Sequence, residues 1–149
     1  MEKLILVRHG AYFGNLHLSP EGVKQIKNLA PKLKDLTQGK KVAIFTSTAI
    51  RTKESAAILA EQLGCPVEEW PVLGSDAYWV ERIEALMEQV NARASDFDVI
   101  IMVTHMEYTD QFPYYFGREM WKIELPFDRL SKGEAIVIDC VAKNRTIIR

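Results

Sequence analysis

The residues best suited to chemistry in this chain come directly after short apolar segments. Arg8 and His9 follow the first of these, residues 3–7, and Gly10 comes next. A guanidinium binds phosphate through two hydrogen bonds, and an imidazole can serve as a covalent nucleophile. Gly10 allows the backbone to turn tightly beside a ligand. The first ten residues therefore suggest phosphoryl chemistry.

Two later apolar segments end in the same way. Residues 41–46 are followed by Ser47 and then by Arg51, and residues 98–104 are followed by His105. Short uninterrupted apolar runs are typical of buried strands in a parallel sheet, and ligands bind beyond the carboxyl ends of such strands. Right-handed crossovers place these ends at one edge of the sheet. The sequence thus predicts that two histidines and two arginines meet in one crevice.

Each of these residues taken alone has an ordinary structural explanation. A histidine at a strand end is more often a hydrogen-bonded structural residue than a catalyst. An arginine on the first turn of a helix is usually a solvated surface charge. Their joint arrival at one edge of the sheet is what favours a functional site.

The segments between these strands carry helix signals. Ser19 is a candidate N-cap, Pro20 suits the first helical position, and apolar residues then recur at helical spacing as far as Leu36. Pro71 indicates that a weaker strand nearby lies at an edge or ends early. Strands alternating with helices predict an α/β three-layer sandwich, a mostly parallel central sheet with helices on both faces. The other expected elements are helices over residues 49–63, 78–93 and 108–116, the weaker strand over 67–73, and a terminal hairpin of strands 134–139 and 145–148.

The composition is that of an ordinary globular protein. The chain has 149 residues, of which 48% are hydrophobic and 26% charged, and we expect residues 1–149 to form a single domain. The net charge of −1 gives no field that would favour nucleic acid or an acidic membrane, and we expect neither partner. Cys65 and Cys140 are far apart and have no metal-binding spacing, which indicates reduced thiols in a cytoplasmic protein.

The chain resembles the histidine phosphatase superfamily, which includes the cofactor-dependent phosphoglycerate mutases. The landmarks occur in family order and cover most of the chain. Its length is most similar to the small branch that includes bacterial phosphohistidine phosphatases. The resemblance rests on Arg8-His9-Gly10 with Asn15 at the usual distance beyond it, on Leu18 to Gly22 at the start of the first helix, on Thr46 to Thr52 around the second arginine, and on Val103 to His105.

This resemblance implies a phosphoglycerate mutase-like fold and a phosphatase that needs neither a metal nor a cofactor. His9 would attack phosphorus and become transiently phosphorylated, after which water would hydrolyse the phosphoenzyme. The substrate would be a phosphorylated small molecule or a phosphoprotein, carrying a phosphomonoester or a phosphohistidine. The residues implied to bind the phosphoryl oxygens are Arg8, Gly10, Asn15, Arg51 and His105.

The general acid is the largest departure from the family pattern. Many members carry a glutamate between the second arginine and the second histidine to protonate the leaving oxygen, and residues 72–76 contain none. Asp76 is the nearest candidate and Glu107 is another, although each could equally be a plain acid at a helix N-terminus. A phosphoramidate leaves easily once its ring nitrogen is protonated. The weak acid signal therefore favours phosphohistidine or another activated phosphate.

Other departures keep two alternative functions open. Ala11 and Tyr12 replace the family's frequent Glu and Thr, and Met106 stands where many members have glycine. A non-catalytic phosphate-binding or regulatory domain is the first alternative, although such a domain would not need a nucleophile. A phosphoglycerate-type mutase is less expected, because residues 51–105 leave no insertion for an enclosing lid.

Aromatic side chains near the predicted site have two interpretations. Tyr12, Phe13, Tyr108 and Tyr115 could form a wall that contacts a substrate ring. Alternatively, most of them pack the helix after His105 onto the sheet, which is the interpretation we favour.

Overall fold

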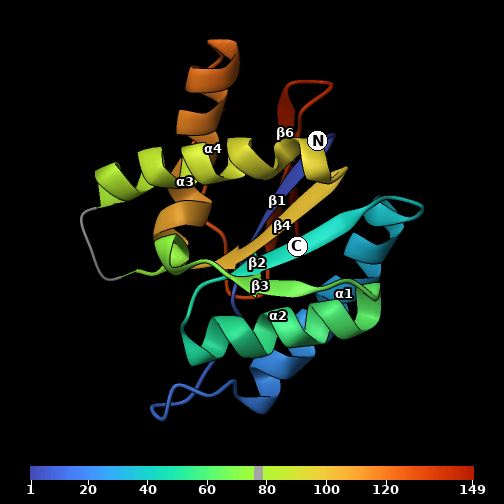
Figure 1. Cartoon of the computed structure of the whole chain (residues 1–149). Coiled ribbons are helices and arrows are strands. Elements are labelled where there is room, and N and C mark those ends of the chain that lie inside the picture. Colours follow the sequence, from blue (N-terminus) through green and yellow to red (C-terminus); the bar gives the residue numbers. More distant parts are fainter. Residues whose placement is uncertain (76–78) are drawn as a thin grey trace.

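The computed structural model describes residues 1–75 and 79–149, which form a sheet between two layers of helices (Figure 1). The sheet has the strand order β3-β2-β4-β1-β5-β6. The strands are β1 (Lys3–Arg8), β2 (Val42–Thr46), β3 (Val67–Glu69), β4 (Val99–Thr104), β5 (Ala135–Asp139) and β6 (Asn144–Ile148). The α-helices are α1 (Pro20–Thr37), α2 (Ile50–Leu63), α3 (Trp79–Arg93) and α4 (Met106–Trp121), and short 3₁₀ turns span Pro71–Leu73 and Ala94–Asp96.

The first four strands of the chain run parallel, whereas on one side of the sheet β5 pairs antiparallel with β1 and β6 pairs antiparallel with β5. β4 pairs with both β1 and β2, so it lies between them, and Arg8 is in register with Thr104. The carboxyl ends of β1, β2 and β4 therefore meet at one edge, as the sequence predicts. β5 runs antiparallel to β1, which places the start of β5 beside the end of β1. The mostly parallel α/β sheet expected from the sequence is confirmed.

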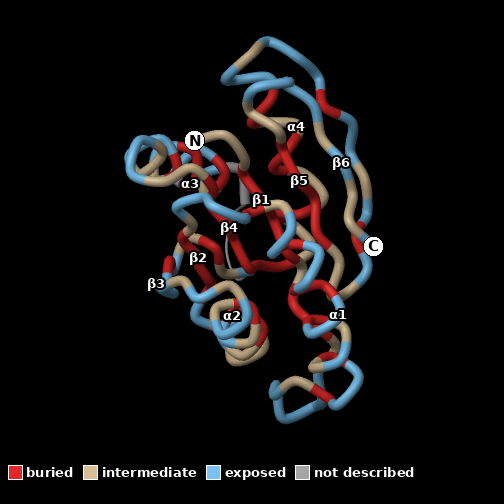
Figure 2. The backbone as a smooth tube through the Cα atoms, turned by 90° about the vertical axis from the view of Figure 1, so that its right-hand side faces the viewer, coloured by how far each residue is buried: buried red, intermediate tan, exposed pale blue. Residues whose placement is uncertain are grey.

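Both faces of the central strands β1 and β4 are buried, whereas no residue of the edge strands β3 and β6 is buried (Figure 2). Leu4 and Leu6 of β1 pack into the cluster that contains α3 and α4, whereas Ile5 and Val7 pack into the cluster that contains α1 and α2. A strand covered on both faces needs apolar residues at successive positions, because neighbouring side chains point to opposite sides. The apolar runs in the sequence have this physical cause.

The helices that carry site residues begin and end at the expected signals. Ser19 caps α1, and its hydroxyl oxygen accepts a hydrogen bond from the Gly22 amide. α2 ends at Gly64, which has the left-handed conformation with φ of 67°. Such a conformation costs glycine little and favours it as a helix terminator. These local signals fix where α1 and α2 enter and leave the sheet.

Two elements differ from their expected bounds. β3 is an edge strand that ends at Glu69, and residues expected to extend it form a 3₁₀ turn that starts with Pro71. α4 runs through Pro113 to Trp121, well beyond the expected residues 108–116. Phe112 and Phe116 are buried in the core, so tertiary packing sustains the helix across the proline. Tyr78, the expected first residue of the third helix, lies outside the described residues.

Candidate active site

The end of β1 is held in place by backbone hydrogen bonds from two neighbouring strands. The His9 amide donates to the Thr104 carbonyl at the end of β4 (3.2 Å). On the other side, the Arg8 amide donates to the Glu134 carbonyl, and the Gly133 amide donates to the carbonyls of Arg8 (3.0 Å) and His9 (3.1 Å). The position of His9 is therefore set by the sheet rather than by a free loop.

The His9 imidazole is buried, with 4% of its surface exposed, and it is oriented by the next peptide. Its Nδ1 lies 2.9 Å from the Gly10 carbonyl oxygen. Because a carbonyl only accepts hydrogen bonds, Nδ1 carries the proton and Nε2 keeps its lone pair. Burial lowers the pKa of His9 from 6.5 to about 4, with smaller contributions from the positive charges of Arg51, Arg8 and Lys132. The ring is neutral at physiological pH.

Arg51, in the first turn of α2, lies between the two histidines. Its Nε donates to His9 Nε2 and one of its terminal nitrogens lies near His105 Nδ1, each at 3.3 Å. The two imidazole rings are 5.4 Å apart between centroids. The structure thus brings together His9, Arg51 and His105, which are separated by 42 and 54 residues in the chain.

His105 is buried and is positioned by a serine at the end of β2. Its Nε2 lies 2.9 Å from the Ser47 hydroxyl, which is 2.6 Å from the Thr52 hydroxyl. A guanidinium can only donate, so His105 Nδ1 accepts from Arg51 and Nε2–H donates to Ser47. The sequence placed Ser47 at the end of a strand but gave no indication that it orients the histidine.

Arg8 points along the face of the sheet that α4 covers. One terminal nitrogen of its guanidinium donates to the Leu130 carbonyl (2.6 Å), and its Nε is buried with no hydrogen-bond partner in the described part of the chain. Asp110 of α4 lies nearby and accepts a hydrogen bond from the Leu130 amide (3.4 Å). Burial raises the pKa of Asp110, while the charges of Arg129 and Arg8 oppose the shift. An unsatisfied buried guanidinium nitrogen is available to an anionic ligand.

Gly10 and Asn15 occupy different environments. The Gly10 amide donates to the Ser55 hydroxyl (3.1 Å), and a Cβ at Gly10 would lie 2.6 Å from the Gly22 carbonyl oxygen. Close packing against the start of α1 therefore requires glycine here. Asn15 is exposed in the loop before α1, where its side-chain oxygen accepts from the His17 amide (3.2 Å). The structure does not bring Asn15 into contact with the two histidines.

Two further side chains lie at the site: Tyr12, which the sequence offered as part of an aromatic wall, and Lys132, which it did not assign. The Tyr12 ring lies edge-on to His9 at 5.3 Å, and the guanidinium carbon of Arg51 is 4.8 Å from its centroid. Lys132 Nζ lies 4.9 Å from the same centroid. Tyr12 thus belongs to the site wall, whereas Tyr108 is buried in the core and its hydroxyl donates to the Val72 carbonyl. The sequence carries one hint that Lys132 lies at the site, which is its position just before the expected strand 134–139. The structure shows that this strand, β5, runs antiparallel to β1.

Residues 4–75 match the sequence profile of the histidine phosphatase superfamily, branch 1. This part of the chain is therefore similar to the histidine phosphatase superfamily. The matched region contains the Arg8-His9-Gly10 segment and Arg51, whose contacts with each other are described above. No curated protein sequence matches the chain.

Solved structures share the fold of this chain over nearly its whole length. An Escherichia coli str. K-12 substr. MG1655 protein assigned as an alpha-ribazole-5'-P phosphatase is 18% identical, with a TM-score of 0.71 over 100% of this chain and 96% of that one. A Nakamurella multipartitia protein assigned as the phosphohistidine phosphatase SixA is 19% identical, with a TM-score of 0.71 over 91% and 83%. A phosphoglycerate mutase from Plasmodium falciparum is 22% identical, with a TM-score of 0.62 over 99% and 88%. The phosphoglycerate mutase-like fold expected from the sequence is confirmed.

The structure places one of the two candidate acids. Glu107 follows His105 and Met106 in the first turn of α4, and its Oε2 is buried without a hydrogen-bond partner among the described residues. Asp76 lies outside the described residues. The described part of the chain contains no group of three metal-ligating side chains and no helix long and apolar enough to span a membrane.

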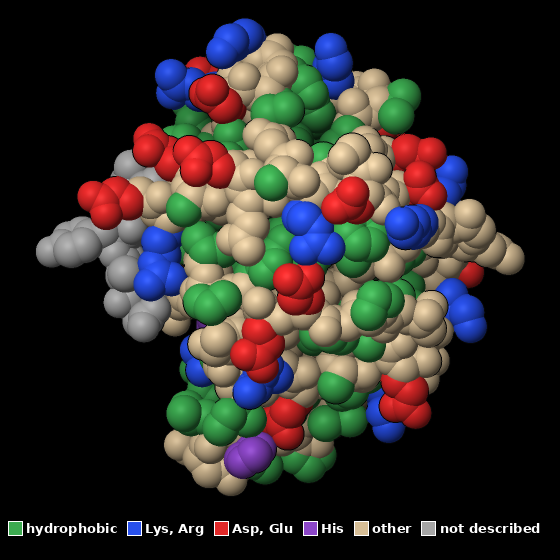
Figure 3. Space-filling model, in the orientation of Figure 1, with side chains coloured by type: hydrophobic (Ala, Val, Ile, Leu, Met, Phe, Trp, Pro, Cys, Tyr) green, Lys and Arg blue, Asp and Glu red, His purple; other side chains and the backbone are tan. Residues whose placement is uncertain are grey.

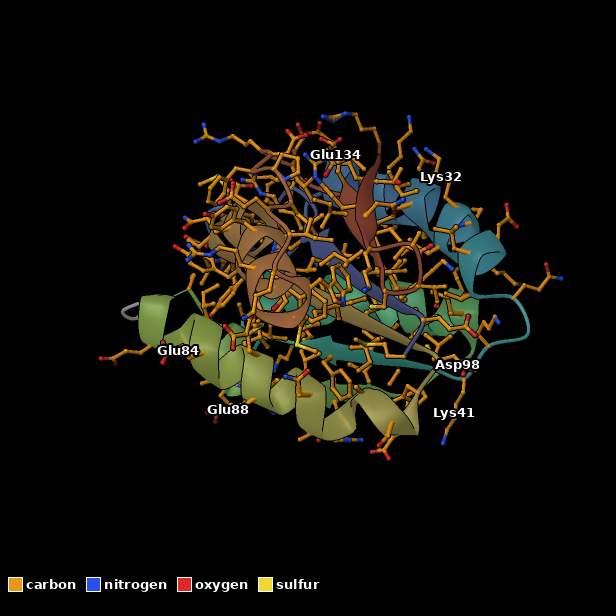
Figure 4. The ribbon with its side chains drawn as sticks, turned by 90° about the horizontal axis from the view of Figure 1, so that it is seen from above. Lys32, Lys41, Glu84, Glu88, Asp98 and Glu134 are labelled. Carbon is orange, nitrogen blue, oxygen red and sulfur yellow. The ribbon has the colours of Figure 1, made fainter. Side chains whose placement is uncertain are left out.

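The opposite edge of the sheet carries a different kind of surface. Lys41 and Asp98, labelled in Figure 4, lie at the amino ends of β2 and β4, where the Asp98 carboxylate accepts from the Lys41 amide (2.8 Å). Acidic and basic side chains are interspersed over the face of the molecule shown in Figure 3.

Proposed function

We propose that this protein is a metal-independent phosphatase that hydrolyses a phosphomonoester or a phosphohistidine through a covalent phosphohistidine on His9. One observation carries the proposal: the Gly10 carbonyl holds the proton of His9 on Nδ1, leaving a neutral ring with a lone pair on Nε2. That lone pair faces the Arg51 guanidinium, at the place where an oxyanion would bind.

In the first step, His9 Nε2 attacks phosphorus and the bond from phosphorus to the leaving group breaks. The leaving group departs with the electron pair and takes up a proton. The contact from Arg51 to His9 is long, at 3.3 Å, so phosphate oxygens readily replace His9 as the acceptor of that hydrogen bond. Substrate binding in this way frees the lone pair for attack.

The other residues of the site stabilise the negative charge on the phosphoryl oxygens. Charge in phosphoryl transfer spreads over the equatorial oxygens, so positioned cations and donors supply most of the catalysis. Arg51 donates to these oxygens from one side, and Arg8, whose buried Nε has no partner in the described structure, donates from the β1 side. His105 joins these donors when its Nδ1 takes up a proton, with its ring held by the hydrogen bond from Nε2–H to Ser47. Asn15 reaches the phosphate only if the exposed loop before α1 changes conformation.

In the second step, water attacks the phosphorus of the phosphoenzyme. The bond between phosphorus and His9 Nε2 breaks, the electron pair returns to the ring, and inorganic phosphate leaves. Glu107 and Asp76 are the candidate groups for the proton that the leaving group requires. A phosphohistidine substrate needs this proton less than an alkyl phosphate does.

The similar structures support this class of reaction. Two of the three proteins compared above are named as phosphatases, one for an alpha-ribazole 5'-phosphate and one for phosphohistidine. Their names span a phosphorylated small molecule and a phosphorylated histidine. A phosphorylated small molecule or a phosphoprotein is accordingly the proposed substrate.

The test is hydrolysis of p-nitrophenyl phosphate and of phosphohistidine by the protein and by its His9→Ala variant, with EDTA present throughout. We expect turnover that persists in EDTA, disappears in the variant, and passes through an acid-labile phosphoenzyme that can be trapped by rapid quenching. Absence of turnover on a broad panel of phosphate compounds, with phosphate still bound, would instead establish a non-catalytic binding domain. Return of the phosphate to another position of the substrate would establish a mutase.

A further inference from the structure

Lys132 lies in a segment that is tied firmly to the end of β1. The Gly133 amide donates to the carbonyls of Arg8 and His9, and the Arg8 guanidinium donates to the Leu130 carbonyl. Within the segment, the Ser131 amide donates to the Glu134 carboxylate (2.6 Å). These bonds hold residues 130–134 against the strand that carries the nucleophile. The backbone of Lys132 is therefore fixed at the site.

The side chain of Lys132 lies beside the aromatic wall of the site. Its Nζ is 4.9 Å from the Tyr12 ring centroid, within the range of a cation–π contact. The same ring lies 5.3 Å from the His9 ring and 4.8 Å from the guanidinium carbon of Arg51. Tyr12 thus serves as a common platform for Lys132 and Arg51. The positive charge of Lys132 also contributes to the lowered pKa of His9.

The charges around His9 do not balance. Arg8, Arg51 and Lys132 bring three positive charges, and no ion pair joins any of them to a carboxylate in the described structure. The carboxylate of Asp110, which lies near Arg8, forms its ion pair with Arg129 instead, at 3.7 Å from the Arg129 Nε. Cations grouped without carboxylates are costly unless an anion binds between them. A phosphate dianion would compensate two of the three charges and leave one over.

We propose that Lys132, supported by Tyr12, binds a second negative charge of the substrate next to the transferred phosphoryl group. The substrate class is a phosphorylated compound that carries a carboxylate or a second phosphate close to the reacting phosphate. Arg8 and Arg51 bind the transferred group itself. This assignment rests on the proposed function of His9 and names the substrate class of that same site.

The kinetic test compares two chromogenic substrates that differ by one charge, p-nitrophenyl phosphate and 3-carboxy-4-nitrophenyl phosphate. We expect the carboxylated compound to have the higher kcat/KM, by about tenfold. Its carboxylate gains a charge-assisted hydrogen bond from Lys132 that p-nitrophenyl phosphate cannot make. Lys132→Met should abolish this preference, and Lys132→Arg should keep most of it. Lys27→Met removes an exposed lysine on α1 and should leave both rates unchanged. If Lys132→Met lowered kcat/KM by the same factor on both substrates, the proposal would be overturned.

A binding test separates this proposal from the catalytic one. Methylphosphonate and phosphonoacetate differ by a carboxylate and neither is hydrolysed, so calorimetry measures their affinities without turnover. We expect phosphonoacetate to bind about tenfold more tightly to the wild type, with the advantage lost in Lys132→Met. If turnover fails and this advantage remains, the phosphatase proposal falls and the Lys132 site stands. If turnover occurs and the two ligands bind equally to the wild type, the Lys132 site falls.

Discussion

The neutral state of His9 makes the stability of the folded protein depend on pH in a defined window. Its pKa in the folded protein is about 4, against 6.5 for an unperturbed histidine, and burial is the main cause. Between these values the unfolded chain binds a proton that the folded protein excludes, so stability rises with pH from 4 to 6.5. Above pH 6.5 the ring is neutral in both states, and this dependence ends.

The size of the effect follows from the shift. A difference of about 2.5 pKa units corresponds to roughly 3 kcal/mol, because one unit is worth about 1.4 kcal/mol. The full amount is lost below pH 4, where the folded protein must bury a charged ring. An asparagine at this position keeps an N–H donor for the Gly10 carbonyl and does not titrate. His9→Asn should therefore lack this part of the pH dependence.

The assay is urea unfolding of the wild type and of His9→Asn from pH 4 to pH 7.5. The free energy of unfolding of the wild type, relative to the variant, should fall by about 3 kcal/mol between pH 7 and pH 4. Ser55→Ala removes the hydrogen bond to the Gly10 amide without changing a titratable group, so its effect should be constant with pH. A difference between wild type and His9→Asn that does not change with pH would refute the reasoning. An NMR titration that places the pKa of His9 above 6 would refute it as well.

Two further substitutions test the geometry around this histidine. Arg51→Lys removes the planar group that contacts both histidines at 3.3 Å; we expect kcat/KM to fall about 100-fold with an unchanged melting temperature, and a fall below threefold would contradict the role given to the guanidinium. Gly10→Ala places a Cβ 2.6 Å from the Gly22 carbonyl oxygen and should destabilise the protein by about 2 kcal/mol or more in urea unfolding. Gly14→Ala is the matched control, since no atom lies within 4 Å of the added Cβ, and equal stability of the two alanine variants would show that the close approach at Gly10 carries no cost.

The parts of the site that were predictable from the sequence depend on local signals and on one general rule. The apolar runs before Arg8, Ser47 and His105 identify three buried strands, and parallel strands connected by right-handed crossovers bring their carboxyl ends to one edge. Ser19 and Gly64 mark helix boundaries through hydrogen-bonding and backbone preferences that act within a few residues. These predictions succeed because each depends on only a short stretch of chain.

Other features depend on contacts between distant segments, and the sequence gave no local signal for them. α4 continues to Trp121, beyond the expected end at residue 116, and burial of Phe112 and Phe116 in the core stabilises it across Pro113. The need for glycine at position 10 arises from a neighbour twelve residues away, Gly22, rather than from the turn that the sequence suggested. Residue type and spacing alone do not specify such approaches.

The sequence by itself determined the layered α/β fold and the group of residues that meet at one edge of the sheet. Those outcomes follow from the alternation of apolar strands and amphipathic helices, which allows few topologies. Only the tertiary structure decided that Gly10 holds the proton of His9, that Arg51 lies between the two imidazoles, and that Lys132 joins them. The physical reason is that protonation and charge depend on burial and on hydrogen-bond partners a few ångströms away, and folding supplies those partners from distant parts of the chain.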